Sequence, residues 1–254
     1  RAPQRHRYGW LGSIAVTVYL GLIVRAAFAL PTTLLIQWSL SPEAQATIDS
    51  RFFGFVWNSG LLAACAATGG VLIGLPLAYL ASRRPTLLNL GCLQAAYAGY
   101  VLPGPVAALA GLVLFTKLAP VFYGSVLILI VAYVIHFLPA GLQSLEPALQ
   151  HMSPNLEEVA RTLGLGMRDT WRRVTLPLVR NGFVVAWVLM FLQTMKELPA
   201  TLLLRPVGFD TLAIRVWMEA SEEYYQLAAP SALLIVLLSL PALALLVSKD
   251  WRAA

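Results

Sequence analysis

Lysine, cysteine and charge in general are scarce in this sequence. None of its three lysines follows a glycine, so the phosphate-binding pattern GxxxxGK[ST] is absent and the chain is not expected to bind ATP itself. The two cysteines form no CxxC pair, and the three histidines are too scattered for a zinc motif. The motifs GxSxG and HExxH are missing as well. We therefore expect no catalytic residues, no metal site, no bound cofactor and no enzyme activity, including that of a membrane-embedded enzyme.

Apolar residues dominate what is present. They make up 59% of the chain, 12% of the residues are charged, and the mean hydropathy is +0.73, which is typical of membrane proteins. The apolar runs are continuous rather than alternating, which indicates helices and not a β-barrel. We expect an all-α membrane protein with six transmembrane helices, each near the ~20 residues that cross a hydrocarbon core. The six runs are Trp10–Leu40, Val56–Ala81, Leu93–Phe115, Gly124–Leu145, Asn181–Leu198 and Leu227–Val247.

The distribution of Lys and Arg predicts the orientation of these spans. The formal net charge is +6, but the basic residues lie between apolar spans rather than on one soluble face, so nucleic acid is not an expected partner. With the N-terminus inside, the inside segments carry 12 of the 18 Lys and Arg and the outside segments carry five. The remaining one, Arg25, lies within the first span. This asymmetry predicts that both termini of a multi-pass protein lie in the cytoplasm.

Prolines and a histidine lie within or beside the predicted spans. Ordinary kinks are one interpretation of the prolines, since neighbouring helices satisfy the carbonyl groups that prolines leave free. The other is a helix broken at a transport pathway, and its expected place is YVLPGPVAAL, where Pro103, Gly104 and Pro105 lie together. His136, near the inner end of the fourth span, is expected to be a packing or interfacial residue, with a pathway role as the alternative.

The stretch EEVARTLGLGMRDTWRRVTLP, residues 157–177, concentrates charge in this apolar chain. It follows Ser153 and Pro154, which are typical of a helix N-terminus with the serine as N-cap and the proline at the first helical position. Glu157 and Glu158 then lie in or near the first turn, where carboxylates suit the helix dipole. A short helix is therefore expected at the start of the longest inside loop.

The glycines in this stretch predict a second short helix. Gly164 suits a left-handed C-cap, and Gly166 lets the chain turn again. The second helix is expected over Met167–Thr175, and the next span is expected to start at Pro177. One interpretation is a basic helix pair that lies on anionic lipid. The other is a rigid helix that transmits a movement to the spans, because its caps give more order than a linker needs.

A pattern within this stretch resembles a known family. Its residues are Glu158, Ala160, Gly164, Val174, Leu176 and Pro177. Their spacing resembles the EAA loop of ABC importer membrane subunits, written EAA, three residues, G, nine residues, I-x-L-P. Val159 for the middle alanine and Val174 for the isoleucine are mild departures. The resemblance implies a type I ABC importer permease (MetI-like) fold, with this loop docked into a groove on a separate ATPase subunit.

The same resemblance implies partners and site residues. The implied partners are an ABC ATPase dimer that holds ATP and magnesium, a second permease half or homodimer partner, a periplasmic substrate-binding protein and the lipid of a bacterial inner membrane. Glu158, Ala160 and Gly164 are expected at the centre of the coupling, with Arg161 and Arg168 as peripheral polar contacts. The whole expected coupling set is Glu157, Glu158, Ala160, Arg161, Gly164, Gly166, Arg168, Leu176 and Pro177.

Further stretches narrow the resemblance. MKELPATLLLRPVGFDTLAIRVW (residues 195–217) resembles the segment after the fifth span in permeases of ferric-iron ABC importers, and NSGLLAACAATGGVLIGLPLAYLASRR, from residue 58, also resembles that family. Ferric iron is therefore the expected cargo, with thiamine, phosphonate, sulfate or polyamine as alternatives. Members of this family often fuse two six-helix halves, so the chain is expected to be one half, the C-terminal one. We expect a core permease domain over residues 56–248 with its coupling loop at 150–177. A tail, the first span and an outer loop are expected over residues 1–55.

The charged residues after the fifth span have two interpretations. Lys196 and Glu197 are adjacent, so they do not face one side of a helix. They either anchor the outer loop at the membrane interface or, with Pro199 and Arg205, belong to a gate or to a docking site for the binding protein. A function of another class, an ion-driven secondary transporter or channel, requires ionisable residues within the spans, and Arg25 is the main candidate for one.

Overall fold

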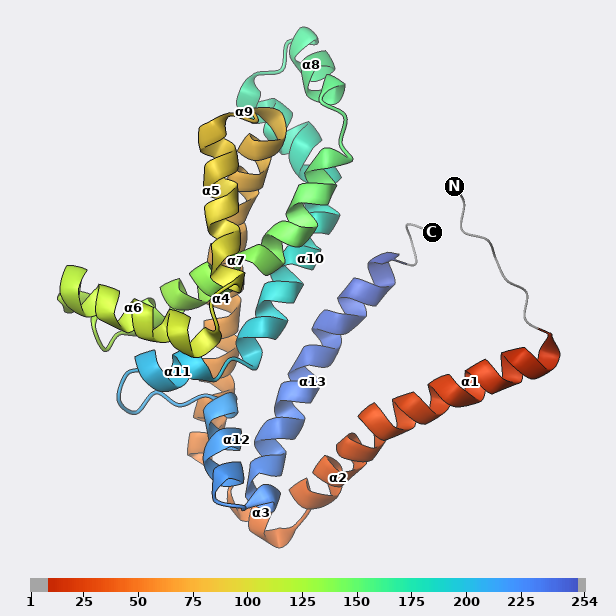
Figure 1. The fold of residues 1–254 in the computed structure, drawn as a ribbon, viewed down its shortest axis with the longest axis vertical. Coiled ribbons are helices and arrows are strands. Elements are labelled where there is room, and N and C mark those ends of the chain that lie inside the picture. Colours follow the sequence, from red (N-terminus) through yellow and green to blue (C-terminus); the bar gives the residue numbers. More distant parts are fainter. Residues whose placement is uncertain (1–8, 251–254) are drawn as a thin grey trace.

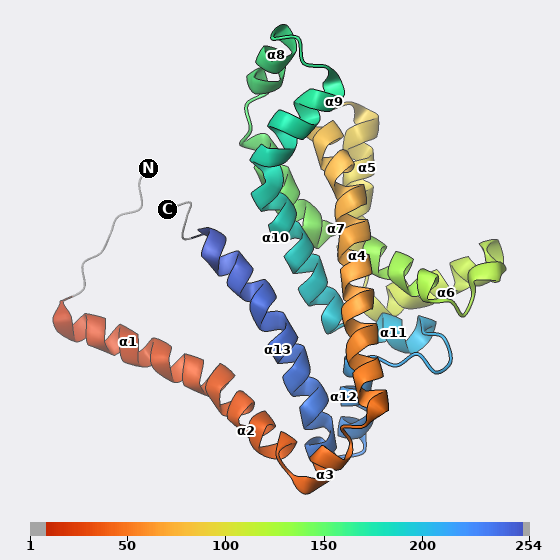
Figure 2. The ribbon, with the colours of Figure 1, turned by 180° about the vertical axis from the view of Figure 1, so that it is seen from behind.

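Three long helices, α4, α7 and α10, pack against one another, and α4 extends along most of the length of the molecule (Figures 1 and 2). The computed structural model describes residues 9–250, with side chains up to residue 246, and every regular element in that part is helical. The elements are α1 (Trp10–Val24), η1 (Arg25–Ala29), α2 (Leu30–Ser39), α3 (Pro42–Ala46), α4 (Ser50–Arg83), α5 (Leu87–Tyr97), η2 (Ala98–Tyr100), α6 (Gly104–Leu118), η3 (Pro120–Phe122), α7 (Val126–Gln150), α8 (Asn155–Thr162), α9 (Met167–Thr170), η4 (Trp171–Thr175), α10 (Leu176–Met195), α11 (Pro199–Leu204), α12 (Leu212–Ser221) and α13 (Tyr225–Asp250). Of the η elements, η1 and η4 are π-helical and η2 and η3 are 3₁₀-helical.

The described chain contains five continuous helices that are long and apolar enough to cross a membrane, and six spans if one bent pair counts as a span. The five are Trp10–Ser39, Ser50–Arg83, Val126–Gln150, Met167–Met195 and Tyr225–Leu246. The expected number of six is therefore reached only if this bent pair is one span, and the expectation of a continuous third span over Leu93–Phe115 was wrong. In its place Leu87–Tyr100 and Gly104–Leu118 meet at 115°.

Proline and glycine chemistry accounts for this break. Pro103 is extended (φ −55°, ψ 139°), and Pro105 lies in the first turn of α6, where a missing N–H costs nothing. The residue before a proline is also biased away from helical angles. The broken-helix interpretation of this stretch is therefore confirmed as geometry, while its connection with a transport pathway stays a prediction.

The second span begins earlier than expected. Asp49 accepts a hydrogen bond from the Phe52 N–H (3.0 Å) and so caps α4 at its start. Residue 55, the expected end of the N-terminal segment, consequently lies inside α4. The division of the chain at residues 55 and 56 is not tested further and stays a prediction.

The core forms where α4, α7 and α10 meet, and small residues allow their backbones to approach closely. A Cβ at Gly182 of α10 would overlap the Ala148 side chain of α7 and lie 3.0 Å from the Ser144 carbonyl oxygen. A Cβ at Gly70 of α4 would overlap the side chain of Met190. Close contact through small residues is the usual way in which helices associate in lipid. Lipid tails are as apolar as the helix surfaces, so the hydrophobic effect does not drive the helices together.

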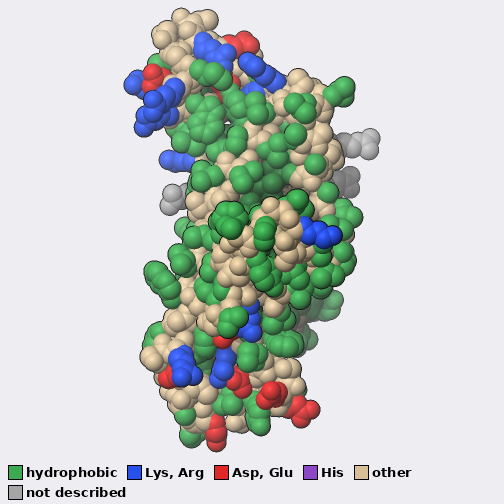
Figure 3. Space-filling model, turned by 90° about the vertical axis from the view of Figure 1, so that its left-hand side faces the viewer, with side chains coloured by type: hydrophobic (Ala, Val, Ile, Leu, Met, Phe, Trp, Pro, Cys, Tyr) green, Lys and Arg blue, Asp and Glu red, His purple; other side chains and the backbone are tan. Residues whose placement is uncertain are grey.

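The two N-terminal helices, α1 and α2, diverge from this core (Figures 1 and 2). α2 packs on α13, where Trp38 and Tyr225 stack with ring centroids 6.2 Å apart, but α1 has no buried residue. Figure 3 shows that charged side chains gather mainly toward the two ends of the face it presents, with hydrophobic side chains between them. We call these ends the α8 end and the α12 end. Such a band of exposed apolar side chains suits contact with lipid.

One long helix replaces the expected short second helix and re-entry at Pro177. The chain is helical without interruption from Met167 to Met195, so the expected separation of these elements was wrong. The reason is the π-helical turn η4, in which the Leu176 N–H bonds to the Trp171 carbonyl. Pro177 follows in the first turn of α10, and the helix passes through it.

Candidate functional site

The short helix α8 starts one residue later than the sequence indicates. Pro154 occupies the N-cap position with φ −55° and ψ −31°, and no side chain caps the helix, so the expectation of a Ser153 cap was wrong. Pro154 already has helical angles, and its carbonyl accepts the Glu157 N–H at 3.0 Å. Ser153 contributes its own carbonyl, which accepts the Leu156 N–H at 3.2 Å.

The C-terminus of α8 is a glycine stop, as expected. Gly164 has φ +89°, the Leu165 N–H donates to the Ala160 carbonyl (3.1 Å), and the Gly164 N–H donates to the Arg161 carbonyl (2.9 Å). This pair of bonds is the Schellman arrangement, which satisfies the last carbonyls of a helix. Gly166, by contrast, has φ −65°, which any residue adopts.

This difference between the two glycines makes a matched test. Gly164→Ala is expected to lower the stability of the loop by about 1–2 kcal/mol, because a left-handed conformation strains any residue with a Cβ. Nothing lies within 4 Å of an added Cβ at either glycine, so sterics do not confound the comparison. Amide hydrogen exchange should show faster opening of α8 in Gly164→Ala and unchanged or slower opening in Gly166→Ala. Equal exchange in the two variants would contradict the glycine stop.

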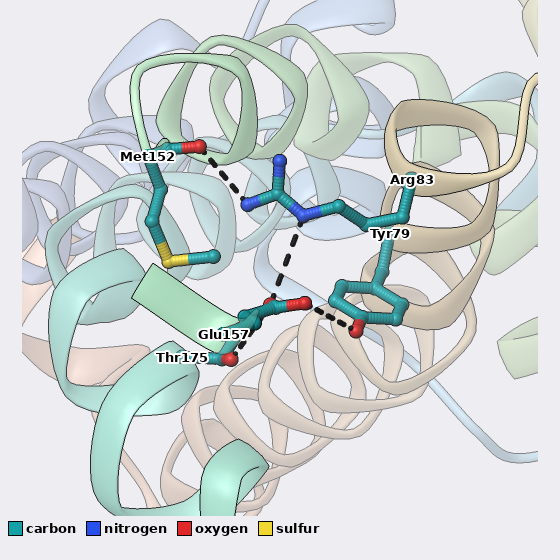
Figure 4. A network of polar contacts seen from close by, with 5 residues as sticks. All are labelled: Tyr79, Arg83, Met152, Glu157 and Thr175. Carbon is teal, nitrogen blue, oxygen red and sulfur yellow. Dashed lines mark hydrogen bonds and ion pairs between the residues drawn. The ribbon is translucent and has the colours of Figure 1, made fainter. Parts of the chain in front are cut away.

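Glu157 of α8 is the buried centre of a polar network at the α8 end. Only 6% of the residue is exposed. Its Oε2 accepts a hydrogen bond from the Tyr79 hydroxyl (3.0 Å), and its Oε1 accepts one from the Thr175 hydroxyl (2.9 Å). Arg83 places its Nε 3.7 Å from Oε1 and donates through Nη2 to the Met152 carbonyl (3.0 Å) (Figure 4).

This network connects segments that are far apart in the sequence. Tyr79 and Arg83 belong to the last turns of α4, Met152 to the link after α7, and Thr175 to η4. The Arg83 and Glu157 side chains are 10% and 8% exposed, so both charges have left water. Burial of an ion pair is costly unless hydrogen bonds compensate both partners. Glu157 has two such bonds, and Arg83 has one through Nη2, while its buried Nε has only the ion pair. The network therefore fixes α8 to the ends of two membrane-spanning helices.

The expected coupling residues separate into an inner and an outer set. Glu157 and Ala160 are buried, whereas Glu158, the expected centre, is exposed. The inner partners Tyr79, Arg83, Met152 and Thr175 were missed by the sequence analysis. Of these residues, Arg83 contributes to the sequence analysis only through its position at the inner end of a span, which predicts the orientation of the spans and not the ion pair. Leu176 is half-buried and Pro177 is exposed, immediately after Thr175.

The outward face of the loop is apolar. Leu156, Val159 and Leu163 follow one another at helical spacing and are 45%, 54% and 78% exposed, and Met167 extends the same surface at 64%. We call these four residues the α8 ridge. The Arg161 and Arg168 side chains form no hydrogen bond or ion pair within the described part of the chain and are exposed. The loop thus offers apolar contacts flanked by free positive charge.

The expected gate residues lie at a distance from this loop, beyond the other end of α10. Lys196 is exposed, whereas the Glu197 carboxylate accepts the Ala200 N–H (3.1 Å) and so fixes the first turn of α11. Pro199 is the first residue of α11, and Arg205 forms an ion pair with Asp210. Lys196 and Glu197 therefore have different environments, and the structure does not bring the four expected gate residues into one cluster with the coupling set.

Among the described residues, no three His, Cys, Asp or Glu side chains come together in a way that would hold a metal ion. Over residues 70–251 the chain matches a family described as the binding-protein-dependent transport system inner membrane component. The chain belongs to this family. It is thus a permease of the ABC importer type and a multi-pass membrane protein.

Known permeases with similar sequences differ in the cargo that their names give. Over 215 residues this permease is 32% identical to the Fe(3+)-transport system permease protein FbpB 2 of Haemophilus influenzae, covering 84% of this chain and 42% of that protein. It is 25% identical to the putative 2-aminoethylphosphonate transport system permease protein PhnV of Salmonella typhimurium, covering 90% of this chain and 91% of PhnV. It is 28% identical to a probable molybdenum ABC transporter permease protein of Haloferax volcanii, covering 93% and 92% of the two chains.

Solved structures support the fold. The permease matches a chain of the MetNI methionine ABC transporter with a TM-score of 0.61 and 17% identity, over 81% of this chain and 99% of that chain. It matches a chain of a bacterial ABC transporter involved in the import of the acidic polysaccharide alginate with a TM-score of 0.71 and 15% identity, over 96% and 94% of the two chains. The expected MetI-like, all-α architecture is confirmed by these likenesses.

Proposed function

We propose that this permease is a membrane-spanning subunit of an ATP-driven importer, and that α8 docks into a groove on a separate ATPase subunit. The observation that carries the proposal is the geometry of α8. The helix is stopped by Gly164, held from within by Glu157 and exposed on its apolar outer face. A rigidly held helix with an exposed apolar surface is suited to receive a movement from a partner protein and to pass it to the spans.

The position of α8 favours a protein partner over a lipid surface. In Figures 1 and 2 the helix lies at the extreme end of the molecule, beyond the ends of α4 and α10. The α8 ridge therefore lies at the end of the molecule, beyond the ends of the long helices that the apolar band covers (Figures 1 and 2). The positive-inside asymmetry supports a cytoplasmic location of the α8 end and of both termini. An ATPase dimer, which holds ATP and magnesium, is accordingly the proposed partner at this end.

The remaining partners follow from the same assembly. A periplasmic substrate-binding protein would deliver cargo at the α12 end, and a second permease half would complete the path. The chain spans 42% of the Haemophilus influenzae relative, so a longer polypeptide with two halves is one source of that second half. Ferric iron is the proposed cargo, supported by the resemblance of residues 195–217 and by that relative. Phosphonate and molybdate are the competing cargoes, since the names of other relatives include them.

The docking proposal is tested by co-purification with the ATPase in detergent, with the partner half present. Leu163→Asp is expected to reduce ATPase retention at least tenfold, because it would place a carboxylate against the apolar wall of the groove on the ATPase. Burial of an unpaired charge costs more than the ~1.4 kcal/mol that corresponds to a tenfold loss of affinity. Leu163→Met is the matched control and should retain the ATPase. Retention that is equal in the two variants would contradict docking through the α8 ridge.

The cargo is tested by uptake into proteoliposomes that contain the assembled transporter. The binding protein is loaded in turn with ferric iron, molybdate and 2-aminoethylphosphonate. ATP-dependent uptake of iron alone would support the proposal. Uptake of either oxyanion without uptake of iron would contradict ferric iron as the cargo, but it would not contradict the permease function.

A further inference from the structure

Four polar side chains lie along one face of the membrane-spanning helix α7. They are His136, Gln143, Glu146 and Gln150. At 100° per residue their spacing keeps them within about 80° of one another around the helix. His136 lies near the middle of the helix, so its expected place near the inner end was wrong. Ionisable groups are rare within membrane spans and mark transport pathways when they face a shared cavity.

This polar face lies against the first half of the broken span. The Tyr97 hydroxyl of α5 donates to the Glu146 Oε1 at 2.5 Å. The backbone of η2 also approaches α7 closely, since a Cβ at Gly99 would lie 2.6 Å from the Ile135 carbonyl oxygen. Glu146 and the Ile135–His136 backbone therefore lie in a seam between α7 and the α5–η2 segment, and Gln143, on the same face of α7 between them, is exposed.

The end of the seam nearest to α11 opens into a cavity of about 280 Å³ at the break between α5 and α6. Gly104, His136 and Glu197 are among its lining residues. The His136 Nδ1 is buried and has no hydrogen-bond partner in the structure. Discontinuous helices line substrate and ion sites in many transporters. Here the break lies beside a carboxylate and a buried imidazole nitrogen that has no hydrogen-bond partner.

The charge of the seam has one sign. α5, α7 and α11 contain no Lys or Arg, and the basic residue of α6, Lys117, is 13 residues from Gly104 in the last turn of that helix. Thirteen residues of helix correspond to about 20 Å. The charged side chains that α5, α7 and the cavity lining contribute are the carboxylates of Glu146 and Glu197, whereas the basic residues Arg83 of α4 and Lys196 lie on adjoining segments outside that lining. In a medium of low polarity this set attracts a cation and repels an oxyanion.

We propose that the seam is part of the cargo path and that the Glu146 carboxylate, with the Tyr97 hydroxyl, contacts a hard metal cation as it passes toward the α8 end. Carboxylate and phenol oxygens are hard ligands that suit such a cation. The proposal rests on the transport function proposed above and specifies it, because it assigns contact residues and selects a cation over the oxyanion cargoes.

A purely structural role for the Tyr97–Glu146 bond makes a different prediction, so two substitutions separate the roles. Glu146→Gln removes the charge and keeps an acceptor for Tyr97. Tyr97→Phe removes the bond and keeps the charge. Glu146→Asp restores the charge on a shorter side chain.

The experiment is uptake of radiolabelled iron, supplied on the loaded binding protein, into proteoliposomes that contain the complete transporter. Glu146→Gln is expected to lower the uptake rate about tenfold, which corresponds to about 1.4 kcal/mol of barrier. ATPase retention and ATP hydrolysis should stay within about twofold of the parent, because the α8 end is unchanged. Glu146→Asp should recover part of the uptake, and Tyr97→Phe should lose less uptake than Glu146→Gln.

Two results would overturn the cation path alone. One is iron uptake by Glu146→Gln at the rate of the parent. The other is that Glu146→Gln and Tyr97→Phe lose uptake to the same extent and both also lose ATPase retention. That result would assign the pair a structural role. A parent transporter that imports an oxyanion and no iron would contradict both the cargo and the cation path. A parent that fails to retain the ATPase would contradict the importer proposal first.

Discussion

Glu157→Ala is expected to eliminate ATPase retention and to lower uptake more than any substitution on the outer face of α8. The substitution leaves Arg83 buried with one hydrogen bond to the Met152 carbonyl and no counter-charge. Removal of one partner from a buried ion pair costs about 3–5 kcal/mol. It also leaves the hydroxyls of Tyr79 and Thr175 without their acceptor. Because these partners belong to α4 and η4, the loss should release α8 from both.

Hydrogen exchange and co-purification together distinguish this effect from lost docking contacts. Glu157→Ala should expose the amides of α8 to fast exchange in the permease alone, before any ATPase is added. Glu158→Ala, at an exposed neighbour, should leave that exchange unchanged. Glu157→Gln, which keeps an acceptor and a similar shape, should lie between the two. Slow exchange of α8 in Glu157→Ala would show that the network does not hold the helix.

Gly182→Leu is the second substitution with a large expected effect, and it acts on the whole bundle. Even a single Cβ at this position would overlap Ala148 and crowd the Ser144 carbonyl, both on α7. Overpacking by one methyl group typically costs about 1–3 kcal/mol, and a leucine would force α7 and α10 apart. Thermal unfolding in detergent should show a markedly lower midpoint for Gly182→Leu and a smaller decrease for Gly182→Ala.

Gly60 supplies the control for this experiment. It lies in α4, and an added Cβ would meet nothing within 4 Å. Gly60→Ala should be neutral or stabilising by up to about 1 kcal/mol, because alanine favours helix more than glycine does. A midpoint for Gly182→Leu equal to that of Gly60→Ala would contradict close contact between α7 and α10.

The sequence predicted those features that depend on neighbours along the chain. Apolar runs located the spans, and Gly164 located the end of α8, because a left-handed stop is local chemistry. The Glu157 network was not accessible in the same way. Tyr79 is 78 residues from Glu157 and Thr175 is 18 residues away, so only the packing of α4 against α10 brings them together. Glu157 was consequently interpreted through the helix dipole, and exposed Glu158 was preferred to it.

The errors in helix boundaries have a similar origin. Pro103 and Pro105 indicated a possible break, but the 115° bend depends on how α6 packs on α11 and α7. Pro177 predicts the start of a span, since prolines favour the first turn of a helix. The π-helical turn before it let the helix continue. A one-residue insertion of this kind leaves little trace in the periodicity of a short polar segment.

The uninterrupted helix from Met167 to Met195 gives the molecule a rigid lever with a built-in fulcrum. Gly182, where α10 contacts α7 closely, is 15 residues from one end and 13 from the other, or about 22 Å and 20 Å. A rotation of about 10° around this crossing would therefore move each end by about 4 Å in opposite directions. One end adjoins α8, and the other leads through Glu197 to α11. A pull on one side of the membrane would thus become a push on the other, without bending the helix.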